Sequence, residues 1–237
     1  MITKQNFIIF SSIDWNTHWQ LHHQLVASIV ESGGKVLYIE NTGTRSPQIR
    51  DFNRIIDRIK IRFNSIHGFK DIENNVTIFT PIFIPYPYNK LSIFLNTLFI
   101  SRSIRSWIKA AKFSESICIS FLPTPAVQGI VEGIDPSLKI YYCADNMSRS
   151  LVDPGKLIKY ENRFFKDVDL VFTTSHKMYK KALQFSDCVY NVPTGIDSSK
   201  FPPLKSLTIP SDIEKIPRPI IGYIGAISEG FNKDLII

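Results

Sequence analysis

The chain has 237 residues, 44% of them hydrophobic, which is enough for a buried core in one large domain or one and a half. A formal net charge of +7 favours anionic partners such as nucleic acid, acidic lipid headgroups or phosphate-bearing substrates. The three cysteines, Cys118, Cys143 and Cys188, are widely spaced and form no C-x-x-C pair, which argues against a zinc site or a disulfide framework. Buried free thiols in a reducing compartment are the simpler expectation.

The N-terminal stretch "MITKQNFIIFSS" lacks the apolar region and the cleavage site of a secretory signal peptide. The apolar stretch Leu91–Ile100 is interrupted by Asn96 and Thr97, and it is about half as long as the ~20 residues of a membrane-spanning helix. We therefore expect a cytoplasmic protein, which leaves peripheral contact with the inner face of the plasma membrane open.

The first elements in the chain form a strand, a helix and a strand. Asn6–Ser12 is a short apolar run typical of a buried strand, and Lys35–Asn41 is a second one. Between them, apolar residues recur at helical spacing until Gly33 and Gly34 end the helix: Leu21, Leu25, Val26, Ile29 and Val30. This order predicts a βαβ unit with parallel strands.

The same alternation continues along the chain and predicts an α/β domain with a doubly wound parallel sheet. The later strands are expected at Asn75–Pro81, Ser116–Pro123, Lys139–Asn146, Leu170–Ser175 and Cys188–Pro193. The helices are expected at Lys90–Lys112, Pro125–Gly133, Pro154–Val168 and His176–Phe185.

A proline-rich segment, residues 198–218, reads as a linker after an N-terminal domain of residues 1–197. The pattern then restarts with a strand at Pro219–Ser228 and the beginning of a helix. A strand and half a helix cannot bury their own apolar faces, so we expect residues 219–237 to be the start of a truncated second domain.

Two basic helices are predicted in the N-terminal domain. One carries Arg50, Arg54, Arg58 and Arg62 on one face. The other carries Lys90, Arg102, Arg105, Lys109 and Lys112 around an apolar face of Leu91, Phe94, Leu95, Leu98 and Trp107. Such helices can lie on an anionic membrane surface, or they can be solvated outer faces over a core-facing stripe. Nucleic acid is not expected, because no recognition motif accompanies the charge.

Three stretches in the right order resemble the GT-B glycosyltransferases, specifically the bacterial group 1 (family 4) enzymes of capsule, exopolysaccharide or teichuronic acid biosynthesis. They are "DWNTHWQLHHQLVASIVESGGKVLYIENTGTRSP", "IYYCADN…YENRFFKDVDLVFTTSHKMYKKA…VYNVPTGIDSSKF" and "PRPIIGYIGAIS". The resemblance implies two Rossmann-like domains facing across a cleft, with the acceptor on the N-terminal domain and a nucleotide-sugar on the C-terminal one. It also implies that no metal is needed. The chain departs from the family pattern at Thr194, and it ends before the family's Glu–seven residues–Glu motif.

Ligands of open α/β sheets bind outside the carboxyl ends of the strands, which is where the residues after the first strand lie. Asp14 and His18 are therefore the candidate catalytic residues, while one of Asp14, Asn16 and Thr17 is expected to cap the helix. Trp15 could stack on an acceptor sugar or simply pack with Trp19, and His22 could bind the acceptor or belong to the surface or core. A metal site is not expected, because no partner ligands are visible.

Further along the chain, Asp145 and Asn146 end a predicted strand at the same edge, where they could bind substrate or form a turn. Gly195 and Asp197 should mark the turn between the domains. Gly225 follows the strand of the second domain and is the candidate for contact with the donor diphosphate.

The function expected from these observations is transfer of a sugar from a nucleotide-sugar to a glycan or lipid-linked acceptor, with no other cofactor. Two alternatives remain open at this point. One is a non-catalytic acceptor- and membrane-binding module, and the other is a nucleotide-sugar epimerase of similar fold, in which the histidines would act as acid and base. In its truncated form the chain is expected to be inactive by itself.

Overall fold

The computed structural model describes residues 5–40, 68–72, 75–84, 86–113, 115–146, 154–196, 198, 201, 203 and 208–223. The chain divides into two compact units, Met1–Gly195 and Ile196–Ile237. Each unit is described by itself. The first unit contains the sheet and every feature discussed below as a site.

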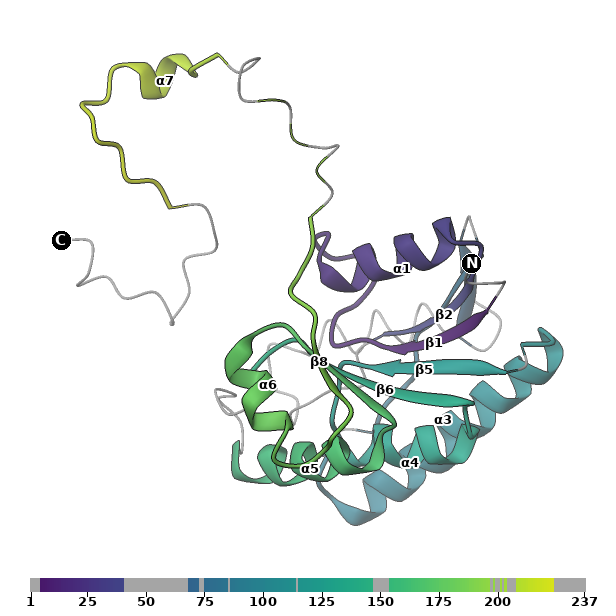
Figure 1. The fold of residues 1–237 in the computed structure, drawn as a ribbon. Coiled ribbons are helices and arrows are strands. Elements are labelled where there is room, and N and C mark those ends of the chain that lie inside the picture. Colours follow the sequence, from purple (N-terminus) through teal and green to yellow (C-terminus); the bar gives the residue numbers. More distant parts are fainter. Residues whose placement is uncertain are drawn as a thin grey trace. The chain divides into compact units, whose positions relative to one another are not determined.

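The first unit is built on an eight-stranded sheet with the order β3-β4-β2-β1-β5-β6-β7-β8 (Figure 1). Neighbouring strands are parallel, except that β3 pairs with β4 in the antiparallel direction. The strands are β1 (Asn6–Phe10), β2 (Lys35–Ile39), β3 (Phe69–Ile72), β4 (Val76–Phe79), β5 (Ser116–Ser120), β6 (Leu138–Cys143), β7 (Leu170–Thr173) and β8 (Val189–Asn191). The α/β class and the largely parallel sheet are therefore confirmed.

Helices cover both faces of the sheet, with α1 on one side and α3, α4 and α5 on the other (Figure 1). Their bounds are α1 (Leu21–Glu31), α3 (Lys90–Ala110), α4 (Pro125–Ile134), α5 (Pro154–Asp167) and α6 (His176–Ala182). Strand β1 shows how the two cores form: Phe7 and Ile9 belong to the cluster packed with α1, and Ile8 and Phe10 to the cluster on the opposite face. This alternation follows from the two-residue period of a strand buried on both faces.

Strand β3 is the element that the sequence pattern missed. It is four residues long and lies at the edge of the sheet, and its central residues Lys70 and Asp71 are exposed. An exposed edge strand needs no continuous apolar run, and charged residues there prevent pairing with other chains. The prediction of a purely parallel sheet was wrong at this edge alone.

Helix α3 buries several small polar residues together with Ile100 and Ile104, and it exposes other large apolar residues. Ser92, Asn96 and Ser101 are buried on the inner side, whereas Leu91 and Phe94 are 65% and 61% exposed. The cause lies in α4. A Cβ atom added to Gly129 would stand 3.0 Å from the Thr97 side chain, and one added to Gly133 would stand 3.0 Å from the Ser101 hydroxyl oxygen. Small residues at these contacts permit the close packing. Of the apolar face predicted for this helix, Leu91, Phe94 and Leu98 are exposed rather than core-facing, whereas Trp107 packs against the core.

The second unit differs from its sequence expectation in the residues that the structure describes. The predicted linker contains a short helix, α7 (Ser211–Glu214). The strand expected at Pro219–Ser228 is irregular as far as Tyr223, and the rest of it lies outside the described residues. A strand requires a hydrogen-bonded neighbour, and none of the described segments pairs with this one.

Candidate functional site

The candidate site lies at the carboxyl ends of β1 and β5. The strand order reverses between these two neighbours, since β2 and β4 lie on one side of β1 while β5, β6, β7 and β8 lie on the other. Such a reversal opens a crevice at the carboxyl edge of a doubly wound sheet, and ligands bind there. The loop from Ser11 to Gln20 leaves β1 at this point and returns as α1. The sequence prediction for the location of Asp14–His18 agrees with this topology.

A closed ring of three hydrogen bonds holds the beginning of this loop on β2. The backbone N–H of Ile13 donates to the Ser11 hydroxyl oxygen at 3.0 Å, and the Tyr38 hydroxyl donates to the Ile13 carbonyl at 3.1 Å. Because the Tyr38 proton is used in this way, Ser11 donates the third bond, to the Tyr38 oxygen. Burial raises the pKa of the Tyr38 phenol, so the hydroxyl keeps its proton at neutral pH.

Glu40 holds the next part of the loop. This residue follows β2 and is only 7% exposed. One carboxylate oxygen accepts the backbone N–H of Trp15 at 2.9 Å, and the other accepts the hydroxyl of Thr80 at 2.7 Å. Sequence reasoning did not single out Glu40, although an acidic residue at the end of a buried apolar strand, in "VLYIEN", was a visible signal.

The start of α1 depends on His23. The N-cap residue is Gln20, whose backbone N–H donates to Nδ1 of His23 at 3.1 Å. Since Nδ1 accepts this bond, Nε2 carries the ring proton and donates to the Trp15 carbonyl at 2.9 Å. His23 is 2% exposed. Its neutral imidazole forms these two hydrogen bonds and so links the loop to the helix.

The prediction that Asp14, Asn16 or Thr17 caps α1 was therefore wrong. The helix begins at Leu21, several residues beyond all three, because the segment between them forms the loop. The Thr17 hydroxyl donates instead to the Asp14 carbonyl at 2.8 Å, a bond local to the loop.

The two tryptophans of the loop have different environments. Trp15 is half-buried and packs against His23 and Tyr38, with ring centroids 5.0 Å apart in both pairs. Trp19 is 56% exposed, and its ring stacks on His23 at 5.2 Å with an interplanar angle of 22°. The sequence favoured Trp15 for stacking on a sugar. The structure makes Trp15 part of the scaffold, and Trp19 is the ring with surface left for a ligand.

His22 is buried between α1 and the sheet rather than open to the crevice. It is 5% exposed, its Nε2 lies 3.0 Å from the Ser12 hydroxyl oxygen, and its ring centroid is 3.9 Å from that of Phe121. Its Nδ1 is buried without a hydrogen-bond partner. Burial, with a smaller contribution from His23, lowers the pKa of His22 to about 4. His22 is therefore neutral at pH 7, and its place in the packing does not fit direct binding of an acceptor.

The remaining predicted site residues of the first unit lie along the same edge of the sheet. His18 is exposed and Asp14 is half-buried in the loop after β1. Asp145 is exposed and Asn146 is half-buried in the turn after β6, which ends at Cys143 rather than continuing through them. Because β5 separates β1 from β6, the two loops start about 10 Å apart.

A second buried polar cluster ties β6 to α5 and α6. Glu161 is completely buried, and its carboxylate accepts the Tyr141 hydroxyl at 3.0 Å and pairs with the Lys181 ammonium. The Cys143 thiol lies 3.6 Å from the same carboxylate, and burial raises its pKa to about 12. The cluster satisfies a buried charge, and it makes Cys143 an inert thiol. Of the other cysteines, Cys118 is buried and Cys188 is exposed, so the expectation of three buried thiols was wrong for Cys188.

The predicted membrane contacts and donor contacts are only partly within the described residues. Arg102 and Arg105 lie exposed on α3, and Gly195 is exposed at the end of the first unit. The other residues of these groups lie outside the described part of the chain: Arg50, Arg54, Arg58, Arg62, Asp197 and Gly225.

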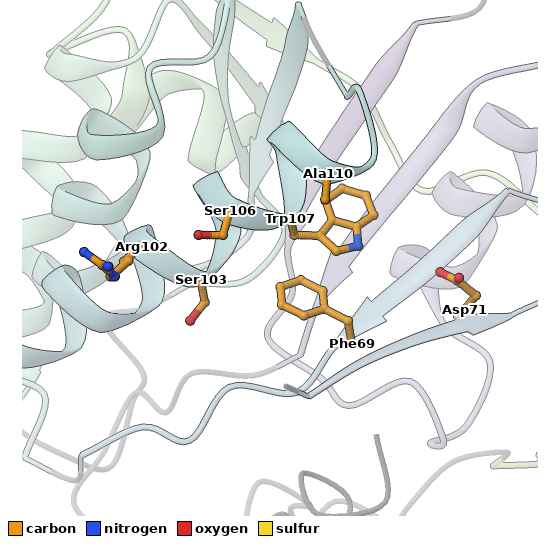
Figure 2. Close-up of a pocket in the computed structure, with 7 residues that line it drawn as sticks. All are labelled: Phe69, Asp71, Arg102, Ser103, Ser106, Trp107 and Ala110. Carbon is orange, nitrogen blue, oxygen red and sulfur yellow. The ribbon is translucent and has the colours of Figure 1, made fainter. Parts of the chain in front are cut away.

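A groove of about 530 Å³ lies between β3 and the C-terminal half of α3 (Figure 2). The Phe69 ring stacks on Phe79 at 4.2 Å and lies parallel to the indole of Trp107 at 5.8 Å, while Arg102 points away from these rings. The lining residues are Phe69, Asp71, Arg102, Ser103, Ser106, Trp107 and Ala110. The groove is therefore separate from the loop that follows β1.

The described residues contain neither a metal-binding cluster nor a membrane-spanning helix. No three His, Cys, Asp or Glu side chains in that part of the chain lie close enough together to hold a metal ion. None of the described helices combines the length and the apolar character needed to cross a bilayer. No protein-family model matches the chain, and no curated protein gives a significant match to it.

Proposed function

We propose that the first unit is the acceptor-binding domain of a GT-B glycosyltransferase, which transfers a sugar from a nucleotide-sugar to a glycan or lipid-linked acceptor. The observation that carries this proposal is the loop after β1. It lies at the reversal of the strand order, it is held by hydrogen bonds with the buried side chains of Tyr38, Glu40 and His23, and it exposes Trp19 and His18. A fixed loop with an open aromatic ring and polar side chains suits recognition of a sugar.

The chemistry assigned to the loop follows from its side chains. Trp19 would supply a flat apolar surface for the face of an acceptor sugar. His18 and Asp14 are the groups that could accept the proton of the attacking hydroxyl or stabilise charge in the transition state. Asp145 and Asn146 would bind the hydroxyls of the acceptor from the neighbouring loop. The donor would bind to residues of a second domain, with Gly225 near its diphosphate.

Acceptor binding tests the proposal without requiring turnover. The intact chain is titrated by calorimetry with a water-soluble prenyl-diphosphate-linked monosaccharide and with free oligosaccharides. Trp19→Ala should weaken binding roughly 2- to 12-fold, the value of one aromatic contact. Trp107→Ala removes a ring from the separate groove beside α3, so it serves as the control and should leave the affinity unchanged. Equal affinity of Trp19→Ala and the unchanged chain, or no binding of any acceptor probe, would contradict the proposal.

A second measurement separates sugar transfer from epimerisation. The chain is incubated with a nucleotide-sugar alone, and the sugar is analysed for a change of configuration. Conversion of the free nucleotide-sugar in the absence of an acceptor would favour the epimerase, and it should be lost in His18→Gln if that histidine acts as the acid or base.

A further inference from the structure

The outer face of α3 is unusually apolar for a helix on a protein surface. We define this face as Leu91, Phe94, Leu98, Phe99, Arg102, Arg105 and Lys109, all of which are exposed. Leu98 and Phe99 are 45% and 57% exposed, and Leu91 and Phe94 are more exposed still. The helix thus has two parts, an apolar N-terminal half and a basic C-terminal half. An apolar patch of adjacent large side chains marks an interaction surface, whereas single exposed residues do not.

Packing among the described residues of the domain does not account for these side chains. The packing of α3 on α4 places Thr97 and Ser101 against the two glycines of α4, and Ile100 and Ile104 belong to the core cluster that contains Val127, Ile130 and Val131. Leu91, Phe94, Leu98 and Phe99 belong to neither of the two core clusters. Their apolar character is therefore available for a partner outside the fold.

The loop before α3 extends the apolar surface. Ile84 is held against the helix by two hydrogen bonds with Asn96, one from its N–H at 2.8 Å and one to its carbonyl at 2.9 Å. The adjacent residues Ile82 and Tyr86 are 47% and 58% exposed. The buried Asn96 thus fixes the loop backbone at Ile84, two residues from each of these exposed side chains.

The charge of α3 indicates which kind of partner its outer face binds. The helix carries Lys90, Arg102, Arg105 and Lys109 and no acidic residue in its 21 residues. A second copy of the same face would bring the two sets of cations together, which disfavours a homodimer. An anionic lipid surface meets both requirements, because cations bind its phosphates while apolar and aromatic side chains enter the region below the headgroups.

We infer that α3 docks the protein on an anionic bilayer, with the apolar N-terminal half of its outer face inserted and its basic half on the lipid headgroups. Helix α3 starts after β4, at the carboxyl edge of the sheet, and ends shortly before the amino end of β5. The inserted half therefore lies at the same edge as the candidate site. This inference does not rest on the proposed function, because it concerns the binding of lipid and not of sugar.

Vesicle co-sedimentation tests the inference. The intact chain is mixed with vesicles of phosphatidylcholine alone or of phosphatidylcholine with phosphatidylglycerol, and it should bind the second kind much more tightly. Arg102→Glu/Arg105→Glu should weaken this binding at least 25-fold, at about fivefold for each basic residue lost. Leu91→Ser/Phe94→Ser should weaken it about tenfold or more, because two partly inserted side chains are removed. Neither pair belongs to a core cluster, and circular dichroism melting curves check the fold.

A matched control separates specific docking from the net positive charge of the protein. Lys177→Glu/Lys180→Glu changes the same charge on exposed residues of α6 and should leave binding within about twofold. Equal loss in this control would overturn the inference in favour of nonspecific attraction. Unchanged binding of Leu91→Ser/Phe94→Ser, or no binding of the unchanged chain, would also overturn it. A dimer of the unchanged chain that Leu91→Ser/Phe94→Ser converts to a monomer would assign the face to a second copy instead.

Discussion

The burial of His22 leads to a specific prediction about stability in acid. Burial lowers the pKa of His22 from 6.5 to about 4. His22 therefore stays neutral in the folded protein at pH values between about 4 and 6.5, whereas in the unfolded chain it takes up a proton below pH 6.5. The stabilisation is therefore complete above the unfolded pKa and is lost as the pH falls from 6.5 toward 4. The linkage relation gives a loss of about 2 kcal/mol in the free energy of unfolding between about pH 7 and about pH 5.

Urea unfolding at these two pH values, followed by circular dichroism, measures this loss. His22→Gln keeps a polar group near Ser12 but cannot titrate, so its pH-dependent loss should be smaller than that of the unchanged chain by about 2 kcal/mol. Carboxylates that titrate over the same range are present in both proteins, and their effect cancels in the comparison. His18→Gln removes an exposed histidine from the same segment and should retain the full loss. If His22→Gln loses as much stability as the unchanged chain, burial of a neutral imidazole is not the cause.

Three further predictions concern the scaffold, each measured by urea unfolding at pH 7. Glu40→Ala leaves two buried donors without an acceptor and should cost about 2–4 kcal/mol, while a loss below about 1 kcal/mol would show that water replaces the carboxylate. Lys181→Met leaves the buried Glu161 carboxylate unpaired and should cost about 3–5 kcal/mol. Glu161→Gln should cost less, because Lys181 is 29% exposed and can reach water; the reverse order would contradict this reasoning. Gly34→Ala should cost about 1–3 kcal/mol, because its Cβ would stand 2.7 Å from the Ile29 side chain; a neutral change would mean that α1 shifts freely.

Much of the first unit could be predicted because its strands are apolar runs buried on both faces. Strands β1 and β2 and helix α1 lie within the expected ranges, and Gly33, with a φ of 86°, ends α1 as expected. Strand β3 could not be found, because a four-residue edge strand with an exposed Lys-Asp pair has no periodic pattern.

The orientation of α3 could not be predicted for a different reason. Large apolar residues lie both on its buried side, as Ile100 and Ile104 do, and on its exposed side, and periodicity alone does not say which side turns inward. The answer depends on the helix against which α3 packs. Gly129 and Gly133 of α4 accept small side chains at close approach, and this property of a separate helix decides the orientation.

The candidate site was predictable in location but not in the roles of its residues. The loop after β1 follows from topology, whereas the assignments within it depend on contacts between residues distant in sequence. Tyr38 and Glu40 reach the loop from the β2 segment, Thr80 supports Glu40 from a third segment, and nothing local to Asp14–His18 indicates them. The exposure of Trp19 likewise could not be predicted, because it depends on where His23 places the ring on which Trp19 stacks.

The residues of this loop have different roles, and only the exposed ones are suited to act directly on a ligand. Trp15 and His23 are bound to each other and to the sheet, and His22 is buried as a neutral ring, so changes at these positions act first on folding. Trp19 and His18 are exposed, so changes there should leave stability within about 0.5 kcal/mol. A loss of ligand binding in Trp19 or His18 variants can therefore be assigned to the ligand itself, whereas the same loss at Trp15, His22 or His23 requires a measurement of stability beside it.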